Sequence, residues 1–341
     1  MKLYVIGFTK KGTTLAKEIC EKMDDANCFS MKCQEEGITM VSSLKNWTEK
    51  AFQKADGIVF VGACGIAVRA IAPFLKEKFC DPAVVVVDEK GSFVISLLSG
   101  HVGKANMLTN KIAQKINGTA VITTATDINN IFAVDVWIKQ KGFLYLKKEE
   151  AKKTMKWISA ALLDKKIVGF DTIFEYDALP KGIQAKKEGE IGISLSIYHE
   201  KKKFEKTLFL IAPIVHIGIG CKKNISSQAV EEAVFGILKK ENIPIEAVEA
   251  LSTIDLKENE KGILYFCEKY QKPLHVFSAE ELSKAEGNFT ASDFVKQITG
   301  VDNVCERAAI CSCDYGKLLL PKKVYNGVTI ALAMKKMTIS F

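Results

Sequence analysis

The 341-residue sequence predicts an α/β protein in which two β/α domains with mainly parallel sheets flank a small α+β middle domain. Two stretches alternate short apolar runs with amphipathic helical patterns, as β/α units do. The stretch between them is rich in lysine and lacks that alternation. The chain is also too long for one ordinary core. We therefore expect domains at residues 1–136, 137–211 and 212–341.

The first domain is predicted from apolar runs that turn residues separate. Its expected strands are residues 2–7, 57–62, 83–87, 93–98 and 120–124. Its expected helices are residues 13–22, residues 63–78 with a kink or a division at Pro73, and a helix that ends at Asn117-Gly118. Ser99 is the expected N-cap of that last helix. The apolar face of this helix comprises Val102, Ala105, Leu108, Ile112 and Ile116.

The middle domain is predicted to hold a helix at 148–163, a strand at 167–171 and a β-hairpin. The runs at 191–198 and 206–211 form this hairpin around the turn His199-Glu-Lys-Lys-Lys203. In the third domain the expected strands are 214–218, 247–252, 274–277, 318–321 and 328–333. The expected helices are 227–240, a segment after 260, 292–299 and 303–311. Asn326-Gly327 predicts a tight turn between the last two strands.

Composition excludes several classes of protein. No run of 18 apolar residues is present, so we expect no membrane span. The start has no signal-peptide pattern, so we expect a cytoplasmic protein whose ten scattered cysteines are reduced thiols rather than zinc ligands. The net charge is +8, but aromatic residues do not interleave with the basic ones, which argues against nucleic acid.

Known catalytic motifs are absent. The sequence contains neither GxSxG nor HExxH. The segment Gly7-Phe-Thr-Lys-Lys-Gly12-Thr-Thr resembles a P-loop but carries Thr13 where the phosphate-binding lysine belongs. Only Arg69 and Arg307 among the 48 basic residues are arginine, the side chain suited to a bidentate grip on carboxylates or phosphates. Chance placement in a lysine-rich chain is the alternative.

Ligands of open α/β sheets bind beyond the carboxyl ends of the strands, so residues after the strands are candidate site residues. Gly62 and Gly65 offer backbone amides at a helix start, and Arg69 follows within about one turn. The alternative reading is that both glycines only allow tight packing.

The segment Ser99-Gly-His101-Val-Gly-Lys-Ala-Asn106 is the richest candidate. It places His101 near a predicted helix N-terminus, where the helix dipole favours the neutral imidazole that can accept a proton. Thr123-Thr-Ala-Thr126-Asp127 ends the next strand with hydroxyls and a carboxylate, which can bind a polar ligand or orient a base. The alternative roles are N-capping for Ser99 and helix capping for Asp127.

The third domain has two further candidates. Gly218-Ile-Gly220-Cys-Lys-Lys223 is a second glycine-rich strand end. The pair Glu306 and Arg307 combines a carboxylate with the second arginine, for which a structural salt bridge is the alternative.

Seven segments together resemble the CbiG family. They are Gly65-Ile-Ala-Val-Arg-Ala-Ile-Ala-Pro73, Asp81-Pro-Ala-Val-Val-Val-Val-Asp-Glu89, Leu98-Ser-Gly-His101-Val-Gly-Lys-Ala-Asn106, Val121-Ile-Thr-Thr-Ala-Thr-Asp127, Gly218-Ile-Gly-Cys-Lys222, Ile254-Asp-Leu-Lys-Glu-Asn-Glu260 and Thr299-Gly-Val-Asp-Asn-Val-Cys-Glu-Arg-Ala-Ala309. The resemblance covers both outer domains, whereas the middle region is similar to the family only in length and position. Lys104 departs from the pattern, because the family usually has a glycine there.

The resemblance implies a hydrolase of anaerobic cobalamin biosynthesis. Such an enzyme opens the δ-lactone of cobalt-precorrin-5A and releases acetaldehyde to give cobalt-precorrin-5B. No cofactor and no metal bound by the enzyme itself are expected, because the cobalt arrives inside the tetrapyrrole substrate. His101 is then the candidate general base, Asp127 orients it or shares its protons, and Glu306 is a further acid/base candidate. Amides at Gly62 and Gly65 are expected to stabilise the lactone oxyanion.

The carboxylate-rich substrate suits a basic cleft. The expected substrate-binding residues are Gly62, Gly65, Arg69, Ser99, Gly100, Lys104, Asn106, Thr123, Thr124, Gly220, Cys221, Lys222 and Arg307. Other partners left open are a second copy of the chain and transient contacts with neighbouring methyltransferases of the pathway. Two alternatives remain, a non-catalytic tetrapyrrole carrier and a generic esterase, and the missing nucleophile elbow argues against the latter.

Overall fold

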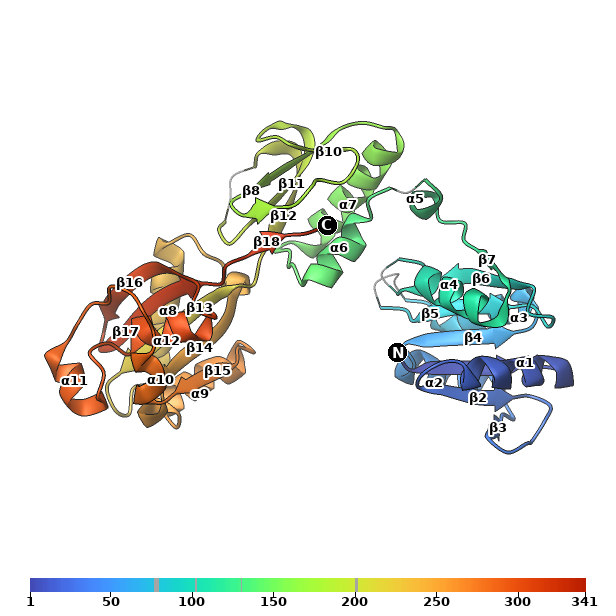
Figure 1. Ribbon diagram of the computed structural model, residues 1–341, viewed down its shortest axis with the longest axis horizontal. Coiled ribbons are helices and arrows are strands. Elements are labelled where there is room, and N and C mark those ends of the chain that lie inside the picture. The colour runs from blue at the N-terminus through green and yellow to red at the C-terminus, as the bar shows by residue number, and fades with distance from the viewer. Residues whose placement is uncertain (77–79, 102, 130, 200–201) are drawn as a thin grey trace. The chain divides into compact units, whose positions relative to one another are not determined.

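The chain folds into two compact units of α/β structure, which confirms the predicted fold class. The computed structural model describes every residue except 77–79, 102, 130 and 200–201. Unit 1 comprises Met1–Lys139 and unit 2 comprises Gln140–Phe341. Figure 1 labels the helices and strands of each unit. Val102, part of the apolar helix face predicted above, lies outside the described residues.

Unit 1 is built on a seven-stranded sheet of order β3-β2-β1-β4-β5-β6-β7. Its strands are β1 (Leu3–Gly7), β2 (Ala26–Ser30), β3 (Ile38–Met40), β4 (Gly57–Val61), β5 (Ala83–Val87), β6 (Phe93–Leu98) and β7 (Thr119–Val121). Its helices are α1 (Lys10–Glu21), α2 (Leu44–Lys54), α3 (Cys64–Ile71), the 3-10 turn η1 (Ala72–Phe74), α4 (Ala105–Ile116) and α5 (Ala125–Ile128). Helix α6 (Val134–Lys141) spans the boundary between the units.

Two hydrophobic cores lie on the two faces of this sheet. On one face Val85 packs with Leu108 of α4, and on the other Val84 packs with Trp47 of α2 and Ile71 of α3. Successive residues of β5 therefore enter opposite cores, which confirms the strand predicted to be buried on both faces. The helical pattern after β4 divides at Pro73, as predicted, because α3 ends at Ile71 and Pro73 lies in η1.

The direction of β6 decides where the candidate residues of unit 1 lie. Strands β1 to β5 run parallel, but β6 pairs with β5 in the antiparallel sense and β7 runs parallel to β6. The carboxyl ends of β6 and β7 therefore lie at the opposite edge of the sheet from those of β1, β4 and β5. A five-residue strand such as β5 separates these edges by about 16 Å.

The predicted start of the helix after β6 is wrong. Helix α4 begins at Ala105, and its N-cap is Lys104 in the left-handed conformation, with φ of 68°. Ser99 also has a positive φ of 59°, so the chain turns twice before the helix starts instead of entering it directly. His101 thus lies in a loop four residues ahead of α4, not at the helix N-terminus.

Unit 2 contains a four-stranded sheet, a five-stranded sheet and a two-stranded pair. Its strands are β8 (Val168–Thr172), β9 (Glu175–Tyr176), β10 (Ile183–Ala185), β11 (Gly189–Ser196), β12 (Phe204–Ile211), β13 (Val215–Cys221), β14 (Val248–Ile254), β15 (Leu274–Phe277), β16 (Lys317–Tyr325), β17 (Val328–Met334) and β18 (Thr338–Ile339). Its helices are α7 (Lys148–Leu163), α8 (Ser227–Lys240), α9 (Lys261–Lys269), α10 (Ala279–Ser283), α11 (Asp293–Thr299) and α12 (Cys305–Ser312), with 3-10 turns η2 (Ile245–Ala247) and η3 (Asp255–Lys257).

The hairpin predicted in the middle region is wrong. Strands β11 and β12 pair in parallel, with Gly189 opposite Phe204 and Ser196 opposite Ile211. A hairpin requires antiparallel neighbours, so β11 and β12 do not form one. Residues 200 and 201 of that stretch lie outside the described residues.

The five-stranded sheet, of order β15-β14-β13-β17-β16, carries the functional features of unit 2. Strands β13, β14 and β15 run parallel, and β16 and β17 form the predicted hairpin, closed by Asn326 and Gly327 at φ of 47° and 83°. Helix α12 packs against β13, β14 and β17. Its close approach requires Gly218, since a Cβ there would lie 1.7 Å from the carbonyl oxygen of Cys305.

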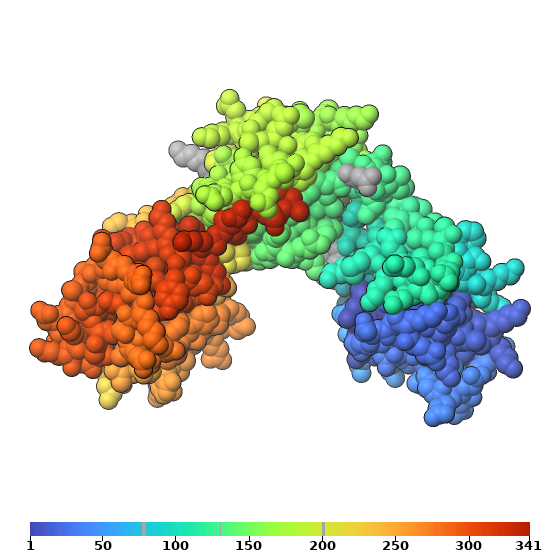
Figure 2. Space-filling view, in the orientation of Figure 1, coloured from blue at the N-terminus to red at the C-terminus, as the bar shows by residue number. Residues whose placement is uncertain are grey.

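The last strand, β18, pairs with β9, and Phe341 packs edge-on against Phe170 of β8. In Figure 2 these final residues, coloured red, lie against the green part of unit 2. In the part of the chain that the structure describes, no helix combines the length and the apolar character that a bilayer span requires.

Candidate functional site

His101, Thr126 and Asp127 form a cluster in unit 1. Nε2 of His101 lies 2.7 Å from Oγ1 of Thr126 and 3.0 Å from Oδ2 of Asp127. The Thr126 hydroxyl can donate or accept, and the Asp127 carboxylate that also faces Nε2 favours the tautomer with the hydrogen on Nε2, which leaves the lone pair on Nδ1. Both side chains are partly exposed, at 20% for His101 and 35% for Asp127. The cluster can therefore take up a proton at Nδ1 while the carboxylate fixes the ring.

Asn106 connects the two segments that carry this cluster, the loop that contains His101 and the start of α5 that contains Thr126 and Asp127. Its Oδ1 accepts from Oγ of Ser96 at 2.6 Å, and its Nδ2 donates to Oγ1 of Thr124, the N-cap residue of α5, at 3.3 Å. Its backbone N–H donates to the carbonyl of Gly100 at 3.0 Å. A Cβ on Gly100 would lie 2.8 Å from Oδ1, so this approach depends on glycine. Asn106 is a buried support for the cluster.

Ser99, Lys104 and Thr123, which were also predicted as site residues, form no side-chain hydrogen bond or ion pair with His101 or Asp127 in the described part of the chain. The hydroxyl of Ser99 is buried without a hydrogen-bond partner among the described residues. Lys104 occupies the N-cap of α4, and Thr123 is exposed between β7 and α5. Asp127 lies in the first turn of α5, where Thr124 rather than Asp127 is the cap residue.

Gly62, Gly65 and Arg69 do not join this cluster. They follow β4, whose carboxyl end lies at the opposite sheet edge from that of β6. The amide of Gly62 donates to the carbonyl of Val87 at 2.8 Å, so it cannot serve a lactone oxyanion as predicted. Arg69 is exposed on α3, and the described residues provide it with no ion pair.

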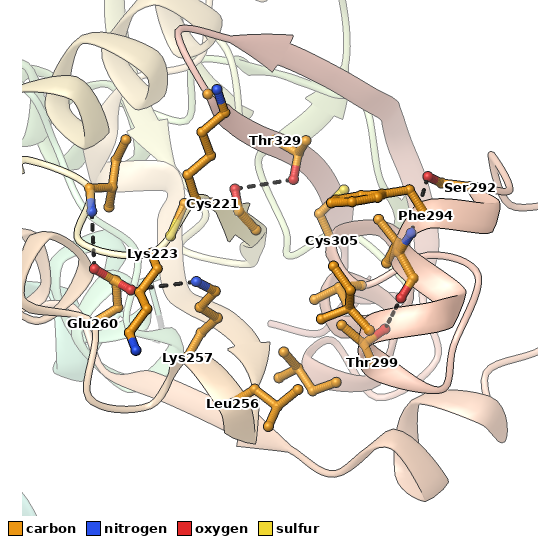
Figure 3. Close-up of a pocket in the computed structure, with 18 of the residues that line it drawn as sticks. Cys221, Lys223, Leu256, Lys257, Glu260, Ser292, Phe294, Thr299, Cys305 and Thr329 are labelled. Atoms are coloured by element: carbon orange, nitrogen blue, oxygen red, sulfur yellow. Dashed lines mark hydrogen bonds and ion pairs between the residues drawn. The ribbon is translucent and has the colours of Figure 1, made fainter.

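Unit 2 contains a pocket of about 1230 Å³ at the carboxyl edge of its five-stranded sheet. This exceeds the usual range for small-molecule sites, about 300–1,000 Å³. Its floor includes the predicted residues Gly220, Cys221 and Lys222 at the end of β13. The segments after β14, helix α11 and the start of α12 complete it (Figure 3). Burial raises the pKa of the Cys221 thiol to about 11, so the thiol stays protonated.

The pocket is basic. Its lining includes five lysines and two carboxylates, namely Lys222, Lys223, Lys257, Lys261, Lys322, Asp255 and Glu260. Glu260 pairs with Lys257 at 3.5 Å and accepts from the amide of Ile225 at 3.1 Å. Within the described ranges, Lys222, Lys223 and Lys261 form no ion pair. The pocket can therefore attract several carboxylates.

An apolar wall also lines this pocket, and no pattern in the sequence predicted it. The wall consists of side chains that stay exposed, at 63% for Leu256, 72% for Phe294, 59% for Ile298 and 69% for Val324. Leu256 belongs to a motif quoted for the family resemblance, but Phe294 and Val324 lie outside every such motif. Helix α11, which carries two of the four, has no buried residue.

Glu306 and Arg307 have structural contacts outside the pocket lining. Glu306 is fully buried and accepts from the amide and the hydroxyl of Thr290, at 2.7 and 2.8 Å, and from the amide of Lys322 at 2.6 Å. Nε of Arg307 donates to Oδ1 of Asp302 at 2.9 Å, and Nη1 donates to the carbonyl of Ala285 at 2.9 Å. Its guanidinium also lies over the ring of Phe289, 4.6 Å from the centroid. Arg307 thus forms the structural salt bridge that was the alternative to a role in substrate binding.

A buried polar network lies at the other, amino-terminal edge of the same sheet. Nδ1 of His216 lies 2.6 Å from Oγ of Ser312, which is also 2.8 Å from Nδ1 of His275. Nε2 of His216 lies 3.1 Å from Oε2 of Glu249. Burial lowers the pKa of His216, against the opposing pull of Glu249. Both histidines lie in strands that the sequence predicted, and no sequence pattern gave either of them a role.

Metal-ligating side chains do not gather in threes anywhere in the described portion of the chain. None of the ten cysteines, all of them among the described residues, lies in a disulfide bond.

Comparisons with known proteins agree on one family. The profile described as "Cobalamin synthesis G N-terminal" matches residues 46–127, and that described as "Cobalamin synthesis G C-terminus" matches residues 215–333. A cobalt-precorrin-5A hydrolase of Salmonella typhimurium is 33% identical over 96% of this chain and 95% of that protein. One of Priestia megaterium is 30% identical over 97% and 94%.

A relative from Methanocaldococcus jannaschii, named a probable cobalt-precorrin-5A hydrolase, is 31% identical over 99% of this chain and 100% of its own length. These relatives span both units, including the middle region that neither profile covers. The chain therefore belongs to the CbiG family of cobalamin synthesis proteins.

Proposed function

We propose that the chain is a hydrolase that opens the δ-lactone of cobalt-precorrin-5A and releases acetaldehyde to give cobalt-precorrin-5B. The observation that carries this proposal is the large basic pocket of unit 2, with its apolar wall. A tetrapyrrole of this type has a broad apolar ring and a periphery of carboxylates, and few other metabolites need both surfaces at once. The names of the three relatives support the same substrate.

In this proposal the lysines of the pocket bind the substrate carboxylates. Lys222, Lys223 and Lys261 lack protein partners among the described residues, so a carboxylate does not have to displace an existing ion pair. Because these amines are partly solvated, each contributes modestly and the set acts together. Cobalt enters as part of the substrate, and the chain provides binding and proton transfer.

The His101 cluster is proposed to supply the chemistry. Nδ1 takes a proton from water as the water oxygen attacks the lactone carbonyl, and Asp127 stabilises the imidazolium through Nε2–H. The lactone C–O bond then breaks, which leaves a carboxylate and an alcohol that receives a proton. When the alcohol loses that proton again, the adjacent carbon–carbon bond breaks and acetaldehyde leaves, with the electron pair remaining on the macrocycle.

An anaerobic incubation with cobalt-precorrin-5A tests the proposal. We expect one acetaldehyde per substrate and a product lighter by one acetaldehyde less one water. Binding without aldehyde would instead identify the chain as a tetrapyrrole carrier. Turnover of simple lactones without any action on the tetrapyrrole would support the esterase alternative and contradict the proposal.

A further inference from the structure

Helix α11 presents apolar side chains to the pocket and has no buried residue of its own. Phe294 and Ile298 are four residues apart, so they lie on the same face of the helix. Both line the pocket, and both stay more than half exposed. Val295, on a different face, packs against the hydrophobic core with Leu282 and Val304. The helix thus packs against the core through one face, and none of the described residues covers the other face.

The two ends of this helix are fixed. Ser292 caps it by accepting from the amide of Val295 at 3.5 Å, and its own amide donates to the carbonyl of Asp302 at 2.9 Å. Ahead of it, Thr290 is held by the buried carboxylate of Glu306, and Asn303 donates to the Thr290 carbonyl at 2.9 Å. These contacts orient the exposed face of α11 toward the pocket.

The opposite side of the pocket has the opposite chemistry. Figure 3 shows Phe294, Thr299 and Cys305 on one side of the open space, and Lys223, Lys257 and Glu260 on the other. A ligand that fills this space meets aromatic and aliphatic carbon on one surface and ammonium groups at its edge. A wholly apolar ligand would leave the lysines desolvated without partners, and a small anion would leave α11 uncovered.

We propose that α11 packs against one face of a planar polycarboxylate macrocycle, with Phe294 stacked on the ring and the lysines across the pocket bound to its carboxylates. This inference rests on the proposed function. It adds that one face of the substrate ring contacts helix α11. Glu306 is then a positioning residue that holds α11, rather than an acid or base of the reaction.

Binding of porphyrins of different acidity tests this assignment. We expect a porphyrin octacarboxylate to bind the full chain more tightly than a dicarboxylate with the same ring, as followed by the shift of the porphyrin absorption band. Phe294→Ala should weaken binding of the octacarboxylate about tenfold, because it removes the stacked ring. Ile298→Ala should weaken it less, and Phe294→Leu should restore part of the loss.

Phe93→Ala is the matched control, since Phe93 is likewise an exposed phenylalanine, at 52% against 72% for Phe294, but lies on β6 in unit 1. It should leave porphyrin binding unchanged. Equal affinity of wild type and Phe294→Ala would overturn the inference even if the wild type releases acetaldehyde. The converse result is a wild type that binds porphyrin through Phe294 and yet releases no acetaldehyde. That result would support the contact between α11 and the ring and would contradict the proposed hydrolase.

Glu306→Gln tests the positioning role. The amide preserves the shape but replaces one acceptor with a donor, so it loses a contact with Thr290 or with the amide of Lys322. We expect KM for cobalt-precorrin-5A to rise several-fold while kcat and its pH profile stay unchanged. A fall in kcat without a change in KM would show that Glu306 acts in the chemistry and would remove it from this inference.

Discussion

At the scale of single residues, the hydrogen bonds of His216 can be assigned from donor chemistry. Glu249 can only accept, so Nε2 of His216 carries the hydrogen and Nδ1 accepts from the hydroxyl of Ser312. Ser312 has one hydrogen to donate, so its oxygen accepts from Nδ1–H of His275. The chain of bonds from His275 to Glu249 therefore runs in one direction only, and it requires a neutral His216.

This arrangement predicts a pH dependence of stability. The unfolded imidazole takes up a proton near pH 6.5, whereas burial lowers the pKa of folded His216 below that value. The unfolded state then binds more protons than the folded state at low pH. The free energy of unfolding should therefore fall as the pH decreases below about 6.5, and the contribution of His216 to it should be complete above that pH. Glu249, with its partner Lys335, and His275 are the charged and titratable groups that face the ring.

Urea denaturation at several pH values between about 5 and 7.5 measures this slope. His216→Gln should reduce it, since the amide cannot take up the proton. His199→Gln, at an exposed position, should keep the wild-type slope. The same slope in wild type and His216→Gln would show that His216 does not titrate differently in the two states.

Single residues also show what the sequence could and could not predict. Gly220, Cys221 and Lys222 were predicted because glycines and a lysine follow an apolar strand, and they line the pocket. Phe294 and Val324 were missed because an exposed apolar residue has no local signature, and only the folded topology brings them to the pocket. Their roles in binding stay predictions.

At the scale of elements, apolar patterns predicted most strands and helices but not strand direction. The run at β6 was predicted as a strand, yet its antiparallel pairing with β5 separates His101 from Arg69. Direction depends on the connection before the strand, and here the short turn at residues 88–92, with Gly91 at φ of 72°, reverses the chain between β5 and β6. Strands β2 and β3 escaped notice because each has at most two fully buried residues and so little pattern.

The packing of α12 on β13 gives a prediction at this scale. Gly218→Ala places a Cβ against the carbonyl of Cys305, so the helix must shift and stability should fall by about 1–3 kcal/mol or more. Gly236→Ala is the matched control in α8, where the nearest atom, in Tyr325, is 4.0 Å away. It should stabilise by up to about 1 kcal/mol. Urea denaturation measures the free energy of unfolding of both variants. Equal changes in the two would contradict the close contact between α12 and Gly218.

At the scale of the whole molecule, part of the net charge of +8 is concentrated in one place. The pocket of unit 2 has five lysines against two carboxylates, which fits the basic cleft expected from composition. The expected arginines do not line it: Arg307 is held by Asp302 and a backbone carbonyl, and Arg69 belongs to unit 1. Lysine, as a compact point charge, suits several loosely placed carboxylates rather than one fixed fork.

The two units are proposed to have separate roles in the reaction. Unit 1 holds the His101 cluster proposed for proton transfer, and unit 2 holds the pocket proposed for substrate binding. The two roles should separate in kinetics, since loss of His101 removes chemistry while the pocket remains intact.

Single-turnover release of acetaldehyde by His101→Ala, with enzyme in excess over cobalt-precorrin-5A, tests this separation of roles. We predict that the variant binds the substrate as tightly as wild type but releases acetaldehyde at least about 10²-fold more slowly. His199→Ala, which removes an exposed histidine of unit 2, should react at the wild-type rate. A wild-type rate in His101→Ala would contradict the claim that this imidazole is the base.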